Sequence, residues 1–226
     1  MKHFFFIFFL YHCIGLNAQW VGISKMLNIH DNKDKHFYRI ENTKGAEYLG
    51  EIEVKGLGQD DVNLFRTIYT KAKKMGANAF HIKALESIDG SLLAFNPEHY
   101  YLSLYYLPMD VDTPTQGEDT AYIIASPTSA HKISINNEKF ILPARTFKKI
   151  SLKPGDIYTL STLKFLGSSI KLSSSGKQSA HYFQVSGFKI KSNPYGKGGM
   201  NLKSGDFTRL EKSYAMFLTS IYQEIK

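Results

Sequence analysis

Apolar and polar positions alternate in short runs through the first half of the chain, a pattern typical of β-strands. The clearest run, residues 46–54, predicts a strand with one face in water. Residues 79–84 and 99–107 predict two more strands. The predicted faces of the first strand are Tyr48, Gly50, Ile52 and Val54 on one side and Leu49, Glu51 and Glu53 on the other.

A helix is predicted between these strands. Asp60 and Asp61 suit a helix N-terminus, and Gly76 is a natural stop. The apolar stripe consists of Val62, Phe65, Ile68, Ala72 and Met75, spaced by three or four residues. The order strand–helix–strand–strand predicts a small βαββ domain over residues 19–107, with the helix across one face of the sheet.

Strand patterns fill most of the second half. Asn136-Asn137 separates two of them and suits a tight hairpin turn, since asparagine tolerates a left-handed backbone. Six to eight short strands predict an all-β sandwich-like domain. A C-terminal amphipathic helix is expected from about Asp206, with a capping box at Thr208 and Glu211. Its wide apolar face must be buried, on the sandwich or against the first domain.

The predicted fold class is therefore α+β, with two domains joined by a linker. Residues 108–119 contain two prolines, are acidic and lack apolar periodicity, so they mark the linker. The second domain spans residues 120–226.

The N-terminus predicts export. A basic start, an apolar run over residues 4–10 and Ala18 resemble a signal peptide covering residues 1–18. An uncleaved anchor is the alternative, but the apolar run is short for one. A periplasmic or secreted protein is expected, with no transmembrane segment after cleavage and, since Cys13 is the one cysteine, no disulfide.

Charge divides unevenly between the halves. Residues 19–119 contain 11 basic and 15 acidic residues, which gives a net charge of −4. Residues 120–226 contain 16 basic and 5 acidic residues, which gives a net charge of +11. The basic half suggests an anionic partner, and export favours an envelope glycan or lipid surface over nucleic acid, which is not expected. The alternatives are that lysines keep sheet edges soluble or that the basic half packs on the acidic half.

Two resemblances accompany these patterns. Leu49-Gly50-Glu51-Ile52 and the helix end running into Gly76-Ala77-Asn78-Ala79 resemble YbjQ-like domains and the Rcs stress lipoprotein, which implies a βαββ envelope domain. Residues 133–162, with Pro154-Gly155, resemble PEGA-like and prealbumin-like sandwich modules. The second resemblance implies a role in attachment or interaction.

Candidate chemistry is sparse. Glu51 and Glu53 share a strand face, but no third polar group is fixed near them by the sequence, so solvation is the simpler interpretation. The histidines show no metal-ligand spacing, and neither a metal site nor a cofactor is predicted. The candidate ligand-binding residues are the lysines in and beside the Gly/Lys loop 193–205 and two strand tyrosines: Lys189, Lys191, Lys197, Lys203, Tyr101 and Tyr105.

These features predict an exported, non-enzymatic envelope protein that acts as a binding or interaction module. The first alternative is a glycan-directed hydrolase that uses Glu51 and Glu53. The second is a structural subunit of an envelope complex, with its C-terminal helix docked on a partner.

Overall fold

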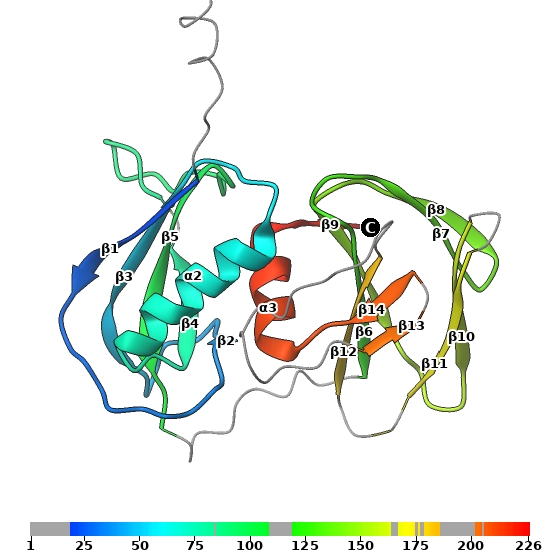
Figure 1. Cartoon of the computed structure of the whole chain (residues 1–226), viewed down its shortest axis with the longest axis horizontal. Helices are drawn as coiled ribbons and strands as arrows, with labels where there is room; N and C mark the ends of the chain where they lie inside the picture. Colours follow the sequence, from blue (N-terminus) through cyan, green and yellow to red (C-terminus); the bar gives the residue numbers. More distant parts are fainter. Residues whose placement is uncertain are drawn as a thin grey trace, which may run out of the picture.

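The structure is a computed structural model of the chain. It describes residues 19–83, 85–108, 119–163, 167–174, 176, 179–185, 202–204 and 206–226. These residues form an α+β fold that is mostly β-sheet with two helices (Figure 1). The predicted signal peptide and most of the predicted linker lie outside the described residues.

The elements follow one another in this order: β1 (Trp20–Met26), β2 (Tyr38–Arg39), β3 (Glu47–Lys55), α2 (Asp61–Lys74), β4 (Ala79–Lys83), β5 (His99–Tyr106), β6 (Thr120–Ile124), β7 (His131–Ile135), β8 (Glu138–Leu142), β9 (Thr146–Ser151), β10 (Ile157–Thr162), β11 (Ser169–Ser173), β12 (Ala180–Val185), β13 (Leu202–Ser204), β14 (Phe207–Arg209), α3 (Lys212–Ile221) and β15 (Gln223–Ile225).

The first half forms a five-stranded sheet in the order β1-β3-β5-β4-β2. Helix α2 packs on one face of it and buries Phe65, Ile68 and Ala72. Asp60 caps this helix as the sequence predicts, since its side chain accepts a hydrogen bond from the backbone N–H of Asn63. Strands β1 and β2 were not among the predicted strands. They lie at the two edges of the sheet.

One predicted strand face is wrong in detail. The pairing of β3 with β5 shifts between Tyr48 and Gly50, which is the signature of a β-bulge. The extra residue reverses the alternation, so Leu49 is fully buried with Ile52 while Tyr48 joins Glu51 on the other face. The sequence pattern, counted without the bulge, assigned Tyr48 and Leu49 to the opposite faces.

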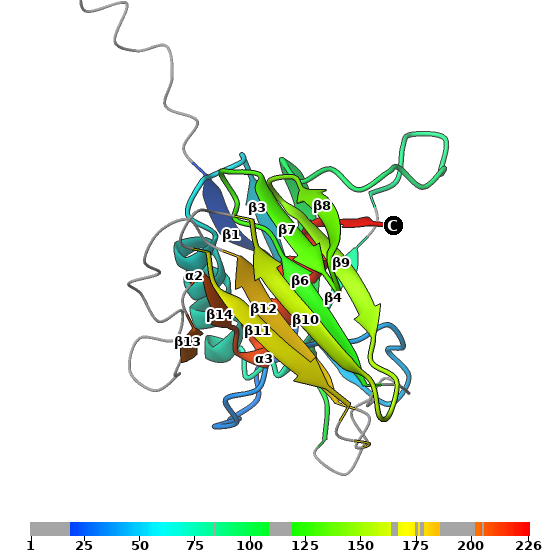
Figure 2. The same ribbon diagram turned by 90° about the vertical axis from the view of Figure 1, so that its right-hand side faces the viewer.

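The second half contains two sheets that pack face to face. A four-stranded sheet has the order β11-β10-β7-β8, and a six-stranded sheet has the order β13-β14-β12-β6-β9-β15 (Figure 2). Ala121 and Ile123 of the six-stranded sheet pack against Ile133 and Leu160 of the other. The predicted hairpin turn is confirmed, because Asn136 and Asn137 both have positive φ values, 49° and 70°.

The C-terminal helix begins later than the sequence predicts. Residues 207–209 form strand β14, and α3 starts at Lys212. Glu211 is therefore the N-cap itself, accepting hydrogen bonds from the backbone N–H groups of Ser213 and Tyr214. The predicted capping box with Thr208 is wrong because Thr208 is paired with Gln184 in the six-stranded sheet.

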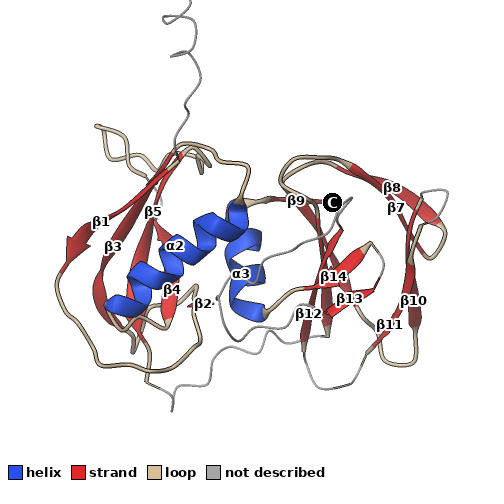
Figure 3. Ribbon diagram, viewed as in Figure 1, coloured by secondary structure: helices blue, strands red, loops and turns tan. Residues whose placement is uncertain are grey.

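Helix α3 lies between the five-stranded sheet and the six-stranded sheet (Figure 3). Phe217 is fully buried in a cluster that contains Phe65 of α2 and Tyr122 of β6. The backbone N–H of Phe37 donates to the hydroxyl of Ser213 on α3, 3.2 Å away. The apolar face of α3 is thus buried within its own chain, and the described halves share one apolar cluster. The domain boundaries at 107 and 120 stay a prediction.

Among the described residues, no helix has the length and apolar character needed to cross a membrane.

Candidate functional site

The five-stranded sheet has an open face opposite α2, and no described element covers it (Figure 3). Strand pairing brings side chains of several strands into register there, because every second residue of a strand points to the same side. Glu53 pairs with Tyr101, Lys55 pairs with His99, and Lys83 also pairs with Tyr101. We define the open face by Trp20, Gly22, Tyr48, Glu51, Glu53, Lys55, His81, Lys83, His99, Tyr101, Ser103 and Tyr105.

Glu53 is the most heavily contacted group on the open face. Its Oε1 accepts a hydrogen bond from the Tyr101 hydroxyl at 2.6 Å and lies 2.8 Å from His99 Nε2 and 2.9 Å from Lys55 Nζ. Hydrogen bonds from Tyr101 and Lys55 lower the pKa of Glu53 to about 2, against the opposing effect of burial. The same bond raises the pKa of Tyr101 to about 12.

Glu51 has a parallel arrangement. Its Oε1 accepts hydrogen bonds from Lys83 Nζ and from the Tyr48 hydroxyl, both at 2.8 Å. Burial pushes the pKa of Glu51 upward, but the bonds from Lys83 and Tyr48 outweigh it, so the net shift is downward. Both carboxylates are bound through Oε1. Neither Oε2 has a hydrogen-bond partner among the described residues, and neither is sealed from solvent, so both can accept from a ligand.

The depressed pKa of Glu53 predicts an acid-sensitive contribution to stability. A carboxyl whose pKa is lower in the folded protein stabilises the fold above its unfolded pKa, here 4.5, and loses that contribution as the pH falls toward about 2. We expect the urea midpoint of the natural chain to fall more steeply between pH 4.5 and pH 2 than that of Glu53→Gln. Equal slopes for the two proteins would contradict the assigned pKa.

Trp20 provides an aromatic surface on the open face. It is 48% exposed, and Lys55 Nζ lies 5.5 Å from its ring centroid. The indole lies over Gly22, where a Cβ would come within 2.1 Å of the ring. Because Gly22 has no side chain, the ring can lie along β1 beside the position of Glu53, with which Gly22 is paired.

The predicted site residues separate into two groups. Tyr101 and Tyr105 lie half-buried on the open face, and the Tyr105 ring is 5.5 Å from that of Tyr48. Lys203 lies in strand β13 at the edge of the six-stranded sheet. The other predicted lysines, Lys189, Lys191 and Lys197, lie outside the described residues.

The expectation that no third polar group stands near the two carboxylates is wrong. Five side chains from three strands contact Glu51 and Glu53, and the register of β3, β4 and β5 brings them there. The sequence offered one usable signal for them, the alternation of polar residues at positions 99–105. It had no signal for Trp20, because β1 was not predicted.

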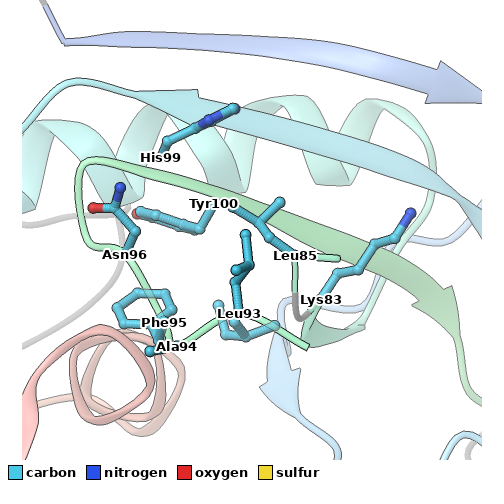
Figure 4. A pocket seen from close by; sticks show the side chains of 9 residues that line it. Lys83, Leu85, Leu93, Ala94, Phe95, Asn96, His99 and Tyr100 are labelled. Atoms are coloured by element: carbon cyan, nitrogen blue, oxygen red, sulfur yellow. The ribbon is translucent and has the colours of Figure 1, made fainter. Parts of the chain in front are cut away.

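A small pocket of about 130 Å³ lies at the base of the β4–β5 loop (Figure 4). Its residues Ile82 and Tyr100 point to the α2 side of the sheet, where they belong to or pack against the apolar core. Leu93, Ala94 and Phe95 line it from the loop side, and His99 and Tyr100 line it from β5. The remaining lining residues are Ile82, Lys83, Leu85 and Asn96. Lys83 and His99 therefore belong both to this pocket and to the ionic contacts of the open face.

The described residues contain no group of three or more histidine, cysteine or acidic side chains that could hold a metal ion. His30, close in sequence to Asp31 and Asp34, instead contacts Glu47, with Nε2 2.7 Å from its Oε2.

No protein-family model, curated protein or solved structure matches the chain.

Proposed function

We propose that this protein is an exported, non-enzymatic binding module of the cell envelope, and that its open face binds a neutral glycan. The observation that carries the proposal is the combination of fixed carboxylates with unused oxygens and an exposed tryptophan on one uncovered sheet face. Export is inferred from the N-terminal sequence pattern.

The charges on the open face support a neutral ligand. Glu51 is paired with Lys83 and Glu53 with Lys55, so the four charges largely cancel. A nucleic acid or an anionic polymer is held by several unpaired cations. Of the lysines described on this face, Lys25 alone has no ion pair; it is paired with Glu51 in the sheet, and its Nζ lies 5.4 Å from the centroid of the Tyr48 ring. Hydroxyl groups, in contrast, can donate to the free carboxylate oxygens and accept from the lysine ammonium groups.

The aromatic side chains support a sugar in particular. Trp20, Tyr101 and Tyr105 present ring surfaces beside hydrogen-bonding groups, a mixture that suits ligands with both apolar C–H faces and hydroxyls. Tryptophan and tyrosine are also the residue types that lose little conformational freedom when they form a binding surface.

The hydrolase alternative fits the carboxylates less well. A glycosidase needs one carboxyl with a raised pKa, so that it stays protonated and acts as the acid, beside a second that stays ionised. The pKa values of Glu51 and Glu53 are both lowered. Their environments shift them in the same direction, which favours holding a ligand over cleaving it.

The proposal predicts that Tyr101→Ala weakens glycan binding by about tenfold, the loss expected when one aromatic contact worth roughly 1.4 kcal/mol is removed. Calorimetric titration of the chain without residues 1–18 with soluble neutral envelope oligosaccharides measures this. The matched control is Tyr158→Ala, which removes a half-buried tyrosine from β10 in the four-stranded sheet. Equal affinities of Tyr101→Ala and the natural chain would overturn the proposal.

A salt series separates this surface from the predicted lysine surface of the second half. Binding to a neutral glycan on the open face should change little between 0.01 M and 0.1 M salt, whereas binding of an anionic envelope component through exposed lysines should weaken. That second partner, an anionic glycan or lipid, remains the alternative prediction from the +11 charge of residues 120–226.

A further inference from the structure

The outer face of the four-stranded sheet β11-β10-β7-β8 is a second uncovered surface, far from the open face in the sequence. On its inner face, Ile133, Ile135 and Leu160 pack in the sandwich core. Because side chains alternate along a strand, the residues between them point outward. Figure 2 views the molecule from the side of this sheet, and no described element lies over its outer face.

Strand pairing aligns polar side chains in a row across this outer face. Lys139 of β8 pairs with Ser134 of β7. Ser161 of β10 pairs with Ser134 on one side and with Ser169 of β11 on the other. The row therefore crosses three strand spacings, about 14 Å. The Ser161 hydroxyl donates to that of Ser169 at 3.0 Å, which leaves the hydrogen of the exposed Ser169 hydroxyl available for a ligand.

Two further lysines flank the row on opposite sides. Strands β7 and β11 run in the same direction, because both are antiparallel to β10. Lys132 lies two residues before Ser134 on β7, whereas Lys171 lies two residues after Ser169 on β11. Strand geometry puts the position of Lys132 about 8 Å from that of Lys139 and about 16 Å from that of Lys171. We define the lysine face by Lys132, Ser134, Lys139, Ser161, Ser169 and Lys171.

The three lysines of the lysine face are exposed, and none has an ion-pair partner among the described residues. The open face differs, since Lys55 and Lys83 each bind a glutamate there. The acidic residues closest in sequence do not belong to the lysine face. Glu138 pairs with Ile135 of the inner face, and Asp156 precedes β10. The lysine face thus carries three positive charges that no described side chain neutralises.

We propose that the lysine face binds an anionic polysaccharide, which lies along the row with its charged groups at the three lysines. Carboxylate or sulfate groups pair with the lysine ammonium groups by charge complementarity. The sugar hydroxyls between those groups exchange hydrogen bonds with the hydroxyls of Ser161 and Ser169. The charges of such a polymer are separated by uncharged parts of its sugar rings, which fits cations that are spread over four strands.

A nucleic acid fits the lysine face less well. A single strand carries one charge per about 3.4 Å, which is much denser than three lysines on four strands. Single-stranded nucleic acids also gain affinity from bases stacked on aromatic rings. The outward-facing residues of the four strands include no aromatic side chain, because Phe140 and Tyr158 pack on the sandwich core.

A lipid surface fits less well for a different reason. The exposed isoleucines of the outer face, Ile141 and Ile157, are each 63% exposed. Ile141 pairs with Lys132 and Ile157 pairs with Ser173, so they lie toward opposite corners of the sheet. They do not form one apolar patch that could enter a membrane.

The test measures the affinity of the chain without residues 1–18 for immobilised alginate, a soluble polyuronate. The triple variant Lys132→Gln, Lys139→Gln, Lys171→Gln should bind about tenfold more weakly at low salt, because three exposed ion pairs are lost. Raising the salt from 0.01 M to 0.1 M should narrow this difference, since screening weakens the ion pairs.

The matched control is the triple variant Lys33→Gln, Lys44→Gln, Lys74→Gln. These lysines are exposed in the first half, so the net charge changes equally while the lysine face is intact. The control should bind alginate like the natural chain. Natural affinity in the lysine-face variant, or an equal loss in both variants, overturns the proposal.

Two further probes distinguish the class of polymer. Duplex DNA and vesicles of equal parts phosphatidylglycerol and phosphatidylcholine should bind more weakly than alginate. Tighter binding of either probe, lost in the lysine-face variant, overturns the polysaccharide assignment. Neutral oligosaccharides should bind the lysine-face variant as tightly as the natural chain, so this proposal and the proposed function of the open face can fail separately.

Discussion

Asp61→Ala will lower the free energy of unfolding by about 3–5 kcal/mol, the usual cost of removing one partner of a buried ion pair. Asp61 is 2% exposed at the start of α2. Its Oδ1 accepts from Arg145 at 3.0 Å, and its Oδ2 accepts from the Tyr222 hydroxyl at 2.5 Å. Burial raises the pKa of Asp61, and the bonds from Tyr222 and Arg145 offset part of the rise.

This contact joins segments that are distant in the sequence. Arg145 precedes β9 and Tyr222 follows α3, whereas Asp61 belongs to the first half. Arg145 also donates to the carbonyl of Gly58 and has a positive φ of 56°, a backbone conformation that costs free energy in a residue other than glycine. We interpret the strained Arg145 backbone as held in place by these side-chain bonds.

The adjacent Asp60 supplies the control for Asp61. Asp60 is exposed and caps α2 through one hydrogen bond, so Asp60→Ala should cost about 1 kcal/mol. Urea denaturation measures both losses. Asp61→Ala and Arg145→Ala should also be non-additive when combined, because they remove the same contact. A loss for Asp61→Ala no greater than that for Asp60→Ala would show that this ion pair does not hold the two halves together.

Phe217→Ala will produce a loss of similar size, about 3–5 kcal/mol, because it leaves a cavity in the cluster shared by both halves. Phe217 is fully buried, and its ring centroid lies 5.4 Å from that of Phe65 and 6.5 Å from that of Phe80. Phe95→Ala is the control, since Phe95 is 42% exposed and should cost at most about 1 kcal/mol.

Scanning calorimetry of Phe217→Ala shows which half of the protein loses thermal stability. If α3 stabilises both halves, the whole melting profile should shift to lower temperature. A profile in which one half melts early and the other keeps its natural melting temperature would show that α3 belongs to one half only.

The spacing of apolar residues in the sequence predicted helices and strands well where only one face of the element is buried. The stripe through Phe65, Ile68 and Ala72 predicted α2, because one face of that helix is buried. Strand β6 shows a different case, since all five of its residues are buried. Its sequence therefore indicates a strand without revealing that one face meets the sandwich core and the other meets α3.

Elements without a repeating local pattern could not be predicted. Strand β2 has two residues and β14 has three, too short for an alternation to be read. The β-bulge near Tyr48 depends on the partner strand, so local alternation assigned that residue to the wrong face. The predicted start of α3 was wrong for a similar reason. Residues 207–209 pair with β12 and form a strand, so the helix begins only after them.

The open face was predictable only in parts. Tyr101, Tyr105 and the two glutamates could be singled out from strand alternation. Their assembly with Lys83 and His99 depends on the order β3-β5-β4, in which strands that follow one another in the sequence are not all neighbours. The position of Trp20 over Gly22 also depends on the pairing of β1 with β3.

The central claim, that the open face binds a neutral glycan, is tested most directly by the fluorescence of Trp20, the single tryptophan of the chain. Acrylamide quenching is measured with and without saturating neutral envelope oligosaccharide. A ligand on the open face should shield the half-exposed indole and lower the quenching constant, and Tyr158→Ala should behave like the natural chain. Unchanged quenching at a ligand concentration that calorimetry shows to be saturating would place the glycan elsewhere and contradict the claim.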